Sequence, residues 1–241
     1  MRAGSRRTIT PVRPAQTGSH DGLSYALWMP DRPPTGGVVV LHGAGSCKEN
    51  HYDFARAASA VGLAALTFDQ RGHGASAGAL DGRAVDDVVA ATELLRETLG
   101  ECDAPVALRG SSMGGYLSLR AAAPARAAAV IAICPASADG LLRGLRDGVF
   151  AFEADERSLA ALLDGGDLHQ VVGSLEIPIL LLHAQGDEQV PVQLSRELAA
   201  GLRAPASRLI EVPGGHHRSI QHDEQLQAVS LRFLSRELSP S

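Results

Sequence analysis

The stretch PVALRGSSMGGYLSLRAAA, residues 105–123, joins an apolar run to a helical pattern through three glycines. Within it, residues 110–114 match the pattern G-x-S-x-G. In that pattern a strand turns abruptly into a helix, and the middle serine occupies the apex in a strained conformation. The glycines are required because the strand end and the helix start approach too closely for side chains. We therefore expect Ser112 to project its hydroxyl above the sheet edge, at a helix N-terminus that favours negative charge. The alternative is a glycine-rich turn with an incidental serine.

Apolar runs alternate with helical patterns along most of the chain. Most of the runs are apolar throughout, which is typical of strands covered on both faces and therefore of a mostly parallel sheet. Residues 24–30 alternate in polarity and predict an antiparallel edge strand. The expected strands are residues 36–43, 62–69, 104–110, 127–134, 177–185 and 207–212. The expected helices are residues 46–62, with a capping box at Ser46 and Glu49, then 83–100, 115–123, 193–201 and 223–238. This order predicts one α/β domain over residues 1–241, a doubly wound sheet with helices on both faces.

Residues 135–175 interrupt this alternation. Their pattern predicts two or three short helices. An insertion at the C-terminal side of the strands lies over the crevice in which α/β proteins bind ligands, so we interpret this segment as a small helical cap. Three arginines of the segment, Arg143, Arg146 and Arg157, fit a solvated helix face, and the alternative is contact with an anionic substrate.

Composition and charge exclude several classes of function. The 241 residues carry a formal charge of −5 without a basic block, which gives no electrostatic footprint for nucleic acid. No run of 18 apolar residues predicts a membrane span, and the basic N-terminus lacks the apolar region of a signal peptide. Three widely spaced cysteines, at positions 47, 102 and 134, fit a reduced cytoplasmic protein. No CxxC or HExxH spacing indicates a metal site.

Several further motifs give the chain a family resemblance. From about residue 20 to residue 236 it resembles the α/β-hydrolase superfamily, in the group of small serine hydrolases related to dienelactone hydrolases and serine aminopeptidases. The motifs are LHGAGS (41–46), FDQRGHGAS (68–76), RGSSMGG (109–115), HAQGDEQVP (183–191) and VPGGHHRS (212–219). The resemblance implies an α/β-hydrolase fold, with nucleophile, acid and histidine in that order along the chain.

The resemblance assigns roles to particular residues. Ser112 is the expected nucleophile, because a serine hydroxyl beside a histidine base can attack an acyl carbon. Asp187 is the expected acid, with its neighbour Glu188 as the alternative. His217 is the expected base, selected over His216 by its spacing from Gly214 in the histidine loop. Two other histidines, His183 and His222, fit less well, because one ends a strand and the other starts a helix.

The remaining assignments concern the surroundings of this triad. The backbone N–H groups of Ala44 and Met113 are the expected oxyanion donors. A hydrogen bond of His42 is expected to shape the loop that holds Ala44. A polar cluster in the FDQRGHGAS turn consists of Asp69, Arg71 and His73. Asp69 and Arg71 are expected to brace the turn. Aromatic candidates for the pocket are Phe150, Phe152 and Tyr52.

The sequence thus predicts a serine hydrolase that cleaves a small-molecule ester, thioester or amide through an acyl-enzyme, with no cofactor or metal and no membrane partner. Acyl transfer or cofactor-free perhydrolysis on the same triad is one alternative. A non-catalytic small-molecule-binding protein on the same fold is another. Nothing in the sequence fixes the oligomeric state.

Overall fold

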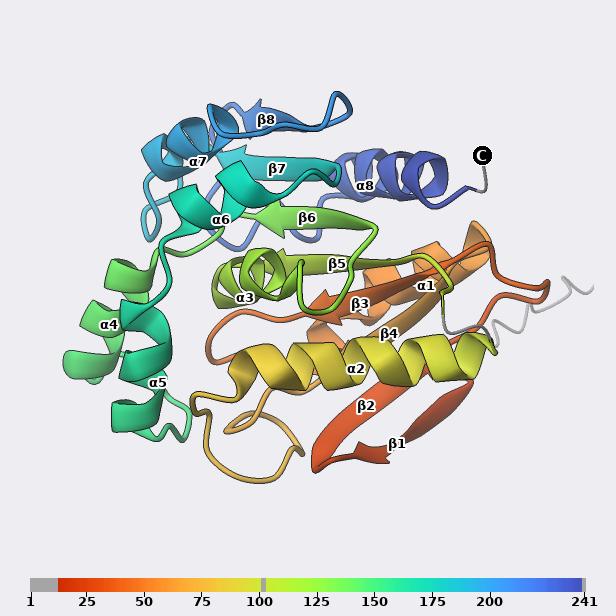
Figure 1. The fold of residues 1–241 in the computed structure, drawn as a ribbon, viewed down its shortest axis with the longest axis horizontal. Helices are drawn as coiled ribbons and strands as arrows, with labels where there is room; N and C mark the ends of the chain where they lie inside the picture. The colour runs from red at the N-terminus through yellow and green to blue at the C-terminus, as the bar shows by residue number, and fades with distance from the viewer. Residues whose placement is uncertain (1–12, 101–102, 240–241) are drawn as a thin grey trace, which may run out of the picture.

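The computed structural model describes residues 13–100 and 103–239 and contains one eight-stranded sheet (Figure 1). Cys102 and residues 1–12 of the basic N-terminal stretch lie outside the described residues. The spatial order of the strands is β1-β2-β4-β3-β5-β6-β7-β8. The strands are β1 (Gln16–His20), β2 (Leu23–Trp28), β3 (Gly37–Leu41), β4 (Ala64–Phe68), β5 (Val106–Ser111), β6 (Ala129–Ile133), β7 (Ile179–Ala184) and β8 (Arg208–Val212).

The strands from β3 to β8 run parallel to one another, and of the described strands only β2 runs in the opposite direction, because β1 is antiparallel to β2 in turn. This confirms the predicted mostly parallel α/β sheet. One expectation is wrong in detail, because β2 is antiparallel but does not form the edge. The edge is β1, whose residues are almost all exposed and therefore carry no apolar signal in the sequence.

Alternate side chains of the central strands build two cores, one on each face of the sheet. Val39 and Leu41 of β3 face one core, whereas Val38 and Val40 face the other. Helices α2 (Ala84–Leu99), α3 (Met113–Ala121) and α7 (Val192–Ala199) cover the first face, and α1 (Tyr52–Ala60) and α8 (Glu224–Glu237) cover the second (Figure 1). Burial on both faces explains why these strands are apolar throughout.

Two helix termini test the sequence signals for helix boundaries. The capping box expected at Ser46 and Glu49 is wrong, because the 3-10 helix η1 (Lys48–His51) precedes α1 and Cys47 occupies its N-cap position. The Ser46 hydroxyl instead accepts a hydrogen bond of 3.0 Å from the Asn50 side chain. By contrast, α2 ends at Gly100 in the left-handed conformation, as expected of a C-terminal glycine.

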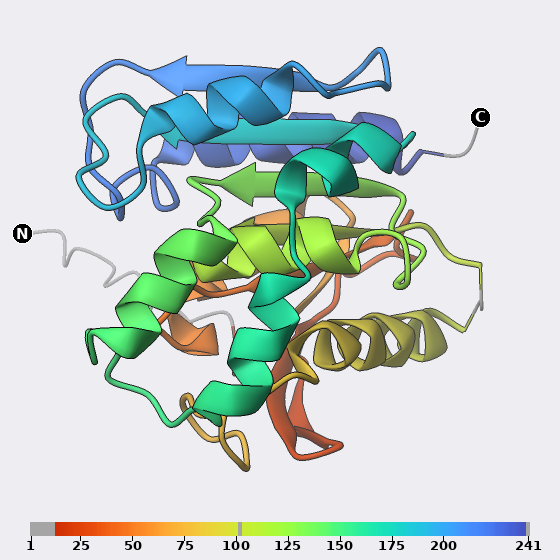
Figure 2. The same ribbon diagram turned by 60° about the vertical axis from the view of Figure 1, so that its left-hand side comes forward.

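Three helices lie between β6 and β7, within the segment that interrupts the sequence pattern. They are α4 (Ala138–Arg146), α5 (Glu156–Asp164) and α6 (Leu168–Ser174). Ser137, Asp155 and Asp167 cap them by accepting a hydrogen bond from the first turn of each helix. Figures 1 and 2 show α4 and α5 beyond the C-terminal ends of the parallel strands.

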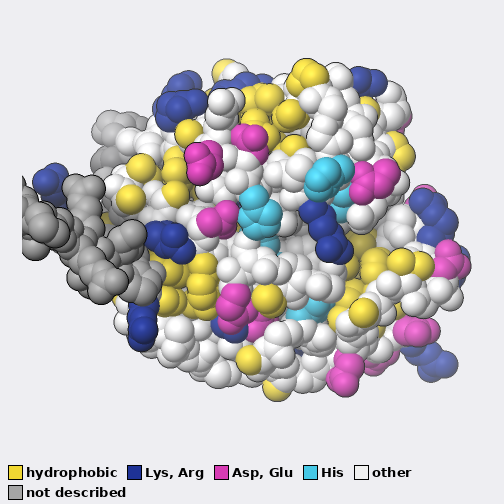
Figure 3. Space-filling model, turned by 180° about the vertical axis from the view of Figure 1, so that it is seen from behind, with side chains coloured by type: hydrophobic (Ala, Val, Ile, Leu, Met, Phe, Trp, Pro, Cys, Tyr) yellow, Lys and Arg dark blue, Asp and Glu magenta, His cyan; other side chains and the backbone are white. Residues whose placement is uncertain are grey.

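The surface carries no dominant charge on the face seen from behind in Figure 3, where acidic and basic side chains alternate around a group of histidines. In the described part of the chain, no helix combines the length and the apolar character needed to cross a membrane. The side chains of Arg143, Arg146 and Arg157 are exposed.

A buried cation lies between β5 and the helices of the second face. Arg109 is 1% exposed, and its guanidinium lies 3.9 Å from the centre of the Phe54 ring. Its Nη2 donates to the Gln221 carbonyl at 3.0 Å, whereas Nε and Nη1 have no partner among the described residues. Burial lowers the pKa of Arg109 to about 10. Because a buried charge without a carboxylate partner costs free energy, Arg109 lowers the stability of the fold.

Arg109→Met is therefore expected to raise the free energy of unfolding by about 1 kcal/mol, because it removes the charge and keeps an unbranched apolar side chain. Arg109→Ala, which leaves a cavity against Phe54, is expected to lower it. Urea denaturation of the three proteins measures both changes. Loss of stability in the methionine variant would contradict this interpretation of Arg109.

Candidate active site

Ser112 lies at the turn between β5 and α3 and has a strained backbone. Its φ of 54° and ψ of −119° are unusual for a residue with a side chain. The turn is fixed on both sides, because the Ser112 N–H donates to the Ile133 carbonyl and the Ser112 carbonyl accepts from Tyr116 and Ala136. This strain is stored at one residue by hydrogen bonds from three segments of the chain.

The glycines beside Ser112 have the steric role expected from the sequence. A β-carbon on Gly110 would overlap the carbonyl of Gly114, and one on Gly114 would overlap the carbonyls of Leu41 and His42. The end of β5, the start of α3 and the end of β3 therefore approach one another at backbone contact distance. This close approach brings the loop after β3 next to Ser112.

Asp187 and His217 come from different loops and form a short hydrogen bond. Asp187 follows β7 and His217 follows β8, and His217 Nδ1 lies 2.7 Å from Asp187 Oδ2. Both side chains are almost fully buried. An ionised carboxylate can only accept, so Nδ1 carries the proton and Nε2 keeps its lone pair. His217 is therefore held in the tautomer that a general base requires.

A network of donors keeps Asp187 ionised. Asp187 Oδ1 accepts from the backbone N–H groups of Gln189 and Val190, each at 2.8 Å. His183 Nε2 lies 3.5 Å from Asp187 Oδ2, the same oxygen that His217 contacts. Burial by itself raises the pKa of Asp187, but the hydrogen bonds from the His183 and His217 rings outweigh burial and hold that pKa well below its usual range.

His183 begins the motif HAQGDEQVP, but the sequence predicts no contact between His183 and the acid beside it, because His183 ends a strand. The structure brings the two together through the spacing H-x-x-x-D, residues 183–187, which leads from β7 into the following turn. Its Nε2 lies 2.9 Å from the Val190 carbonyl and its Nδ1 lies 2.7 Å from the Ser195 hydroxyl. The ring thus links the acid loop to α7, and this spacing was the only sequence signal for it.

The alternative site residues lie differently. His216 is exposed, and its backbone rather than its ring bonds to Ser219. The Glu188 side chain accepts a hydrogen bond of 3.4 Å from the backbone N–H of His217, not from its ring. His222 pairs with Asp53 at 3.0 Å. The structure therefore brings together Asp187 and His217, and neither alternative makes the corresponding side-chain contact.

The loop that follows β3, residues 42–48 (the β3 loop), reaches the strained serine. A β-carbon on Gly43 would lie 3.2 Å from the Ser112 Cβ. In the described structure, the backbone N–H groups of Ala44 and Met113 donate to no other protein group. Both residues adjoin the turn, so both amides are available to an anion beside the Ser112 hydroxyl.

His42 holds the base of the β3 loop. It is fully buried, its Nδ1 donates to the Gly43 carbonyl at 2.8 Å, and its Nε2 accepts from the Gln70 N–H at 3.0 Å. Burial and, to a lesser extent, the nearby His73 ring lower the pKa of His42 to about 4. A neutral His42 can make both bonds, which agrees with its expected local role.

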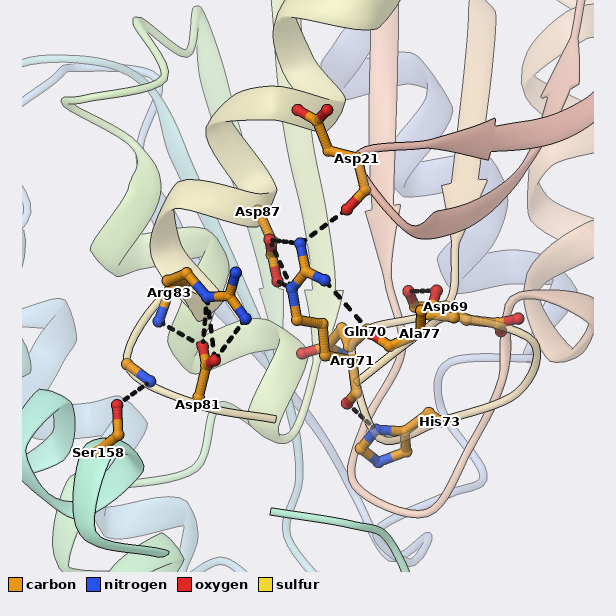
Figure 4. Close-up of polar contacts among 12 residues, drawn as sticks. Asp21, Asp69, Gln70, Arg71, His73, Ala77, Asp81, Arg83, Asp87 and Ser158 are labelled. Carbon is orange, nitrogen blue, oxygen red and sulfur yellow. Dashed lines mark hydrogen bonds and ion pairs between the residues drawn. The ribbon is translucent and has the colours of Figure 1, made fainter. Parts of the chain in front are cut away.

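The loop that follows β4, residues 69–78 (the β4 loop), braces its neighbours (Figure 4). Arg71 forms a two-pronged ion pair with Asp87 of α2 and also donates to the carbonyls of Asp21 and Ala77. Asp69 is fully buried and accepts from the backbone N–H and the Nζ of Lys48. Both side chains are therefore bonded to the surrounding structure, as the bracing interpretation requires.

An open pocket of about 560 Å³ lies beside the candidate residues. Ser112 and His217 both line it, together with Ala44 of the β3 loop. The apolar lining comes from α4 and the residues that follow it: Leu141, Val149, Phe150 and Ala151. The polar lining comes from other loops: Asn50, Gln189, Arg218, Gln221 and His222.

The three aromatic candidates have different positions. Phe150 lines the pocket, and Phe152 stacks on it with ring centres 5.1 Å apart. Tyr52 does not line this pocket, because its ring packs edge-on against Trp28 at 5.2 Å. The expectation for Tyr52 is therefore wrong, since the first turn of α1 faces the core of the second sheet face.

One group of side chains has the composition of a metal site. Ligand atoms of Cys134, His183 and Asp187 lie within 4.8 Å of one another. Protein groups already engage both nitrogens of His183 and both oxygens of Asp187. Burial raises the pKa of the Cys134 thiol, which disfavours the thiolate that metals bind. These residues therefore fit a hydrogen-bonded support for the acid better than a metal site.

Two family models match the chain. The model of the S33 serine aminopeptidases matches residues 32–147, and the model of TAP-like proteins matches residues 165–240. The chain belongs to the α/β-hydrolase superfamily. Its sheet order, the turn at Ser112 and the succession of Ser112, Asp187 and His217 along the chain follow the pattern of α/β-hydrolases.

Proteins similar to this chain include monoacylglycerol lipases. The chain is 27% identical to a monoacylglycerol lipase from Mycolicibacterium smegmatis over 249 residues, which cover 84% of this chain and 88% of the relative. A monoacylglycerol lipase structure from Paleococcus ferrophilus has a TM-score of 0.70 at 22% identity, covering 90% and 98% of the two chains. Est1E from Butyrivibrio proteoclasticus, described with bound ferulic acid, has a TM-score of 0.72 at 20% identity, covering 93% and 98%.

The burial of neutral His42 predicts a loss of stability in acid. The pKa of His42 is about 4 in the folded protein, below its ordinary value of 6.5. Between pH 6.5 and pH 4, His42 therefore binds a proton in the unfolded chain but not in the folded protein. The free energy of unfolding falls as the pH drops through this range. Between pH 7 and pH 5, this one group should lower the free energy of unfolding by about 2 kcal/mol.

His42→Gln is the matched control, because an amide can donate and accept but does not titrate in this range. Urea denaturation at pH 7 and pH 5 should show a loss smaller by about 2 kcal/mol in the variant. An equal loss in both proteins would show that His42 does not carry the pH dependence.

Proposed function

We propose that this α/β-hydrolase is a serine esterase of the lipase type that cleaves small-molecule esters through an acyl-enzyme. The observation that carries the proposal is the His217–Asp187 hydrogen bond of 2.7 Å beside a pocket that Ser112 also lines. In this proposal Ser112 is the nucleophile, His217 the general base and acid, and Asp187 the residue that orients His217. The backbone N–H groups of Ala44 and Met113 are the oxyanion donors.

The first half of the reaction forms the acyl-enzyme. His217 Nε2 takes the Ser112 hydroxyl proton while Oγ attacks the ester carbonyl carbon. The resulting oxyanion accepts from the Ala44 and Met113 amides, and each such donor stabilises the transition state by about 3 kcal/mol. Ionised Asp187 stabilises the imidazolium. The tetrahedral intermediate then expels the alcohol, which leaves with the proton from Nε2.

The second half releases the acid. His217 Nε2, neutral again, takes a proton from water as the water oxygen attacks the acyl carbon. A second tetrahedral intermediate forms at the same amides and collapses, and Ser112 Oγ recovers its proton from the imidazolium. No metal or cofactor takes part in either half in this proposal.

Two findings support an ester as the substrate. The proteins similar to this chain include two monoacylglycerol lipases, which are enzymes named for ester cleavage. The pocket also has one apolar wall, around Phe150, and one polar wall, around Gln221, which suits a bond between an apolar acyl group and a polar alcohol. We further propose that residues 135–175 act as a cap on a single domain, because Leu141 and Phe150 reach the pocket from that side.

Ser112→Ala should reduce the hydrolysis of short-chain p-nitrophenyl esters by about 10⁴-fold or more, because no other group can form the acyl-enzyme. A fluorophosphonate probe should label the wild type and leave the variant unlabelled, and far-UV circular dichroism should show the same fold in both. Full turnover by a folded alanine variant would overturn the proposal.

The neighbouring histidines offer a matched pair of variants. His217→Ala should reduce kcat by about 10⁴-fold or more, because it removes the base, whereas His216→Ala should keep kcat within about three-fold. Steady-state kinetics on one p-nitrophenyl ester measure both. The reverse order of effects would transfer the role of base to His216.

A further inference from the structure

His73 of the β4 loop holds the β3 loop by its backbone. The His73 side chain accepts a hydrogen bond at Nε2 from the Gly45 N–H, with a distance of 3.1 Å. Gly45 directly follows Ala44, whose N–H is a proposed oxyanion donor. The orientation of the Ala44 amide therefore depends on a peptide that His73 holds from outside the pocket.

The opposite nitrogen of His73 is tied to a rigid turn. Nδ1 lies 3.0 Å from the Arg71 carbonyl, which can only accept, so Nδ1 carries the proton and Nε2 is the acceptor. Arg71 is itself fixed by its two-pronged pair with Asp87 and by its bond to the Asp21 carbonyl (Figure 4). His73 thus connects the β3 loop to a turn that α2 and the β1–β2 hairpin hold in place.

The faces of the His73 ring contact two further parts of the site. The ring centre lies 4.2 Å from that of Phe152, in the segment between α4 and α5, and Phe152 in turn stacks on Phe150 of the pocket wall. The His42 ring, at the base of the β3 loop, lies 4.9 Å away. His73 is 5% exposed, so these contacts enclose it.

We propose that His73 is a positioning residue that presets the Ala44 amide through Gly45 and aligns the Phe150–Phe152 wall with it. This inference rests on the proposed function, because the Ala44 amide matters only if an oxyanion forms beside Ser112. His73 acts in its neutral form, because a proton on Nε2 would remove the lone pair that accepts the hydrogen bond from the Gly45 N–H. Burial lowers the pKa of His73 and so keeps the ring neutral. The ionisable groups that face the ring are His42 and Asp69, and Asp69 is already bonded to Lys48.

Three variants separate the hydrogen bond from the packing. His73→Phe keeps a flat ring against Phe152 but removes the acceptor. His73→Gln restores an acceptor, because its Oε1 can replace Nε2. Phe152→Leu keeps the acceptor and removes the stacked ring.

The proposal predicts a split between kcat and KM on a soluble p-nitrophenyl ester. His73→Phe should lower kcat by about ten-fold or more with KM within about two-fold, because an oxyanion donor acts only in the transition state. His73→Gln should recover most of that loss. Phe152→Leu should keep kcat within about two-fold and raise KM, because it loosens the pocket wall.

Hydrogen exchange at the Gly45 amide, measured by NMR, gives a readout that does not depend on turnover. Exchange should be faster in His73→Phe than in the wild type and slow again in His73→Gln. Wild-type kcat in His73→Phe, or unchanged Gly45 exchange in that variant, would overturn the inference. A wild-type protein that hydrolyses no ester and resists the fluorophosphonate probe would instead overturn the proposed function, while the Gly45 exchange would still decide whether His73 holds the β3 loop.

Discussion

The close approach of three backbone segments around Ser112 is the constraint on which the rest of the site depends. The end of β3, the end of β5 and the start of α3 leave no room for a side chain at Gly110 or Gly114. The chain can turn in that space only with Ser112 at a φ of 54°. Such strain persists only where surrounding bonds determine the conformation, and here they come from Ile133, Tyr116 and Ala136. The serine is therefore fixed by β6, by the first turn of α3 and by the residues that follow β6.

The loops around Ser112 are held by buried polar side chains rather than by regular structure. Asp69, Gln70 and His73, all from the β4 loop, bond to the β3 loop. Asp187 is likewise fixed by two backbone N–H groups and by the His183 and His217 rings. Hydrogen bonds between buried groups are stronger than in water, although Gln70 Oε1 has no partner among the described residues. The site thus rests on a set of loops that are locked to one another at backbone atoms.

The sequence predicted β3 to β7 because these strands are buried on both faces and are mostly apolar, and it predicted the partly exposed β8 from the apolar residues Leu209, Ile210 and Val212. It failed where that signal is absent. The edge strand β1 reads QTGSH, is exposed and has no apolar pattern. The capping box at Ser46 was wrong because a 3-10 turn intervenes, and a spacing of three residues cannot reveal such a turn. The contact between His183 and Asp187 was not predicted, although both lie in HAQGDEQVP, because local patterns do not show which face of a strand end meets a neighbouring loop. The spacing within the histidine loop did favour His217, whose ring the structure places against Asp187.

The position of α4 to α6 in the chain has an evolutionary consequence. These helices enter after β6 and leave before β7, yet β6 and β7 pair directly from Val130–Ile179 to Ile133–Leu182. An exchange of the whole segment would therefore leave the register of the sheet unchanged, and the shape of the pocket wall can diverge faster than the residues below it. The exchange is limited where the segment contacts the rest of the fold, because Phe152 packs against His73 and the backbone of Glu153 and Asp155 bonds to Leu80.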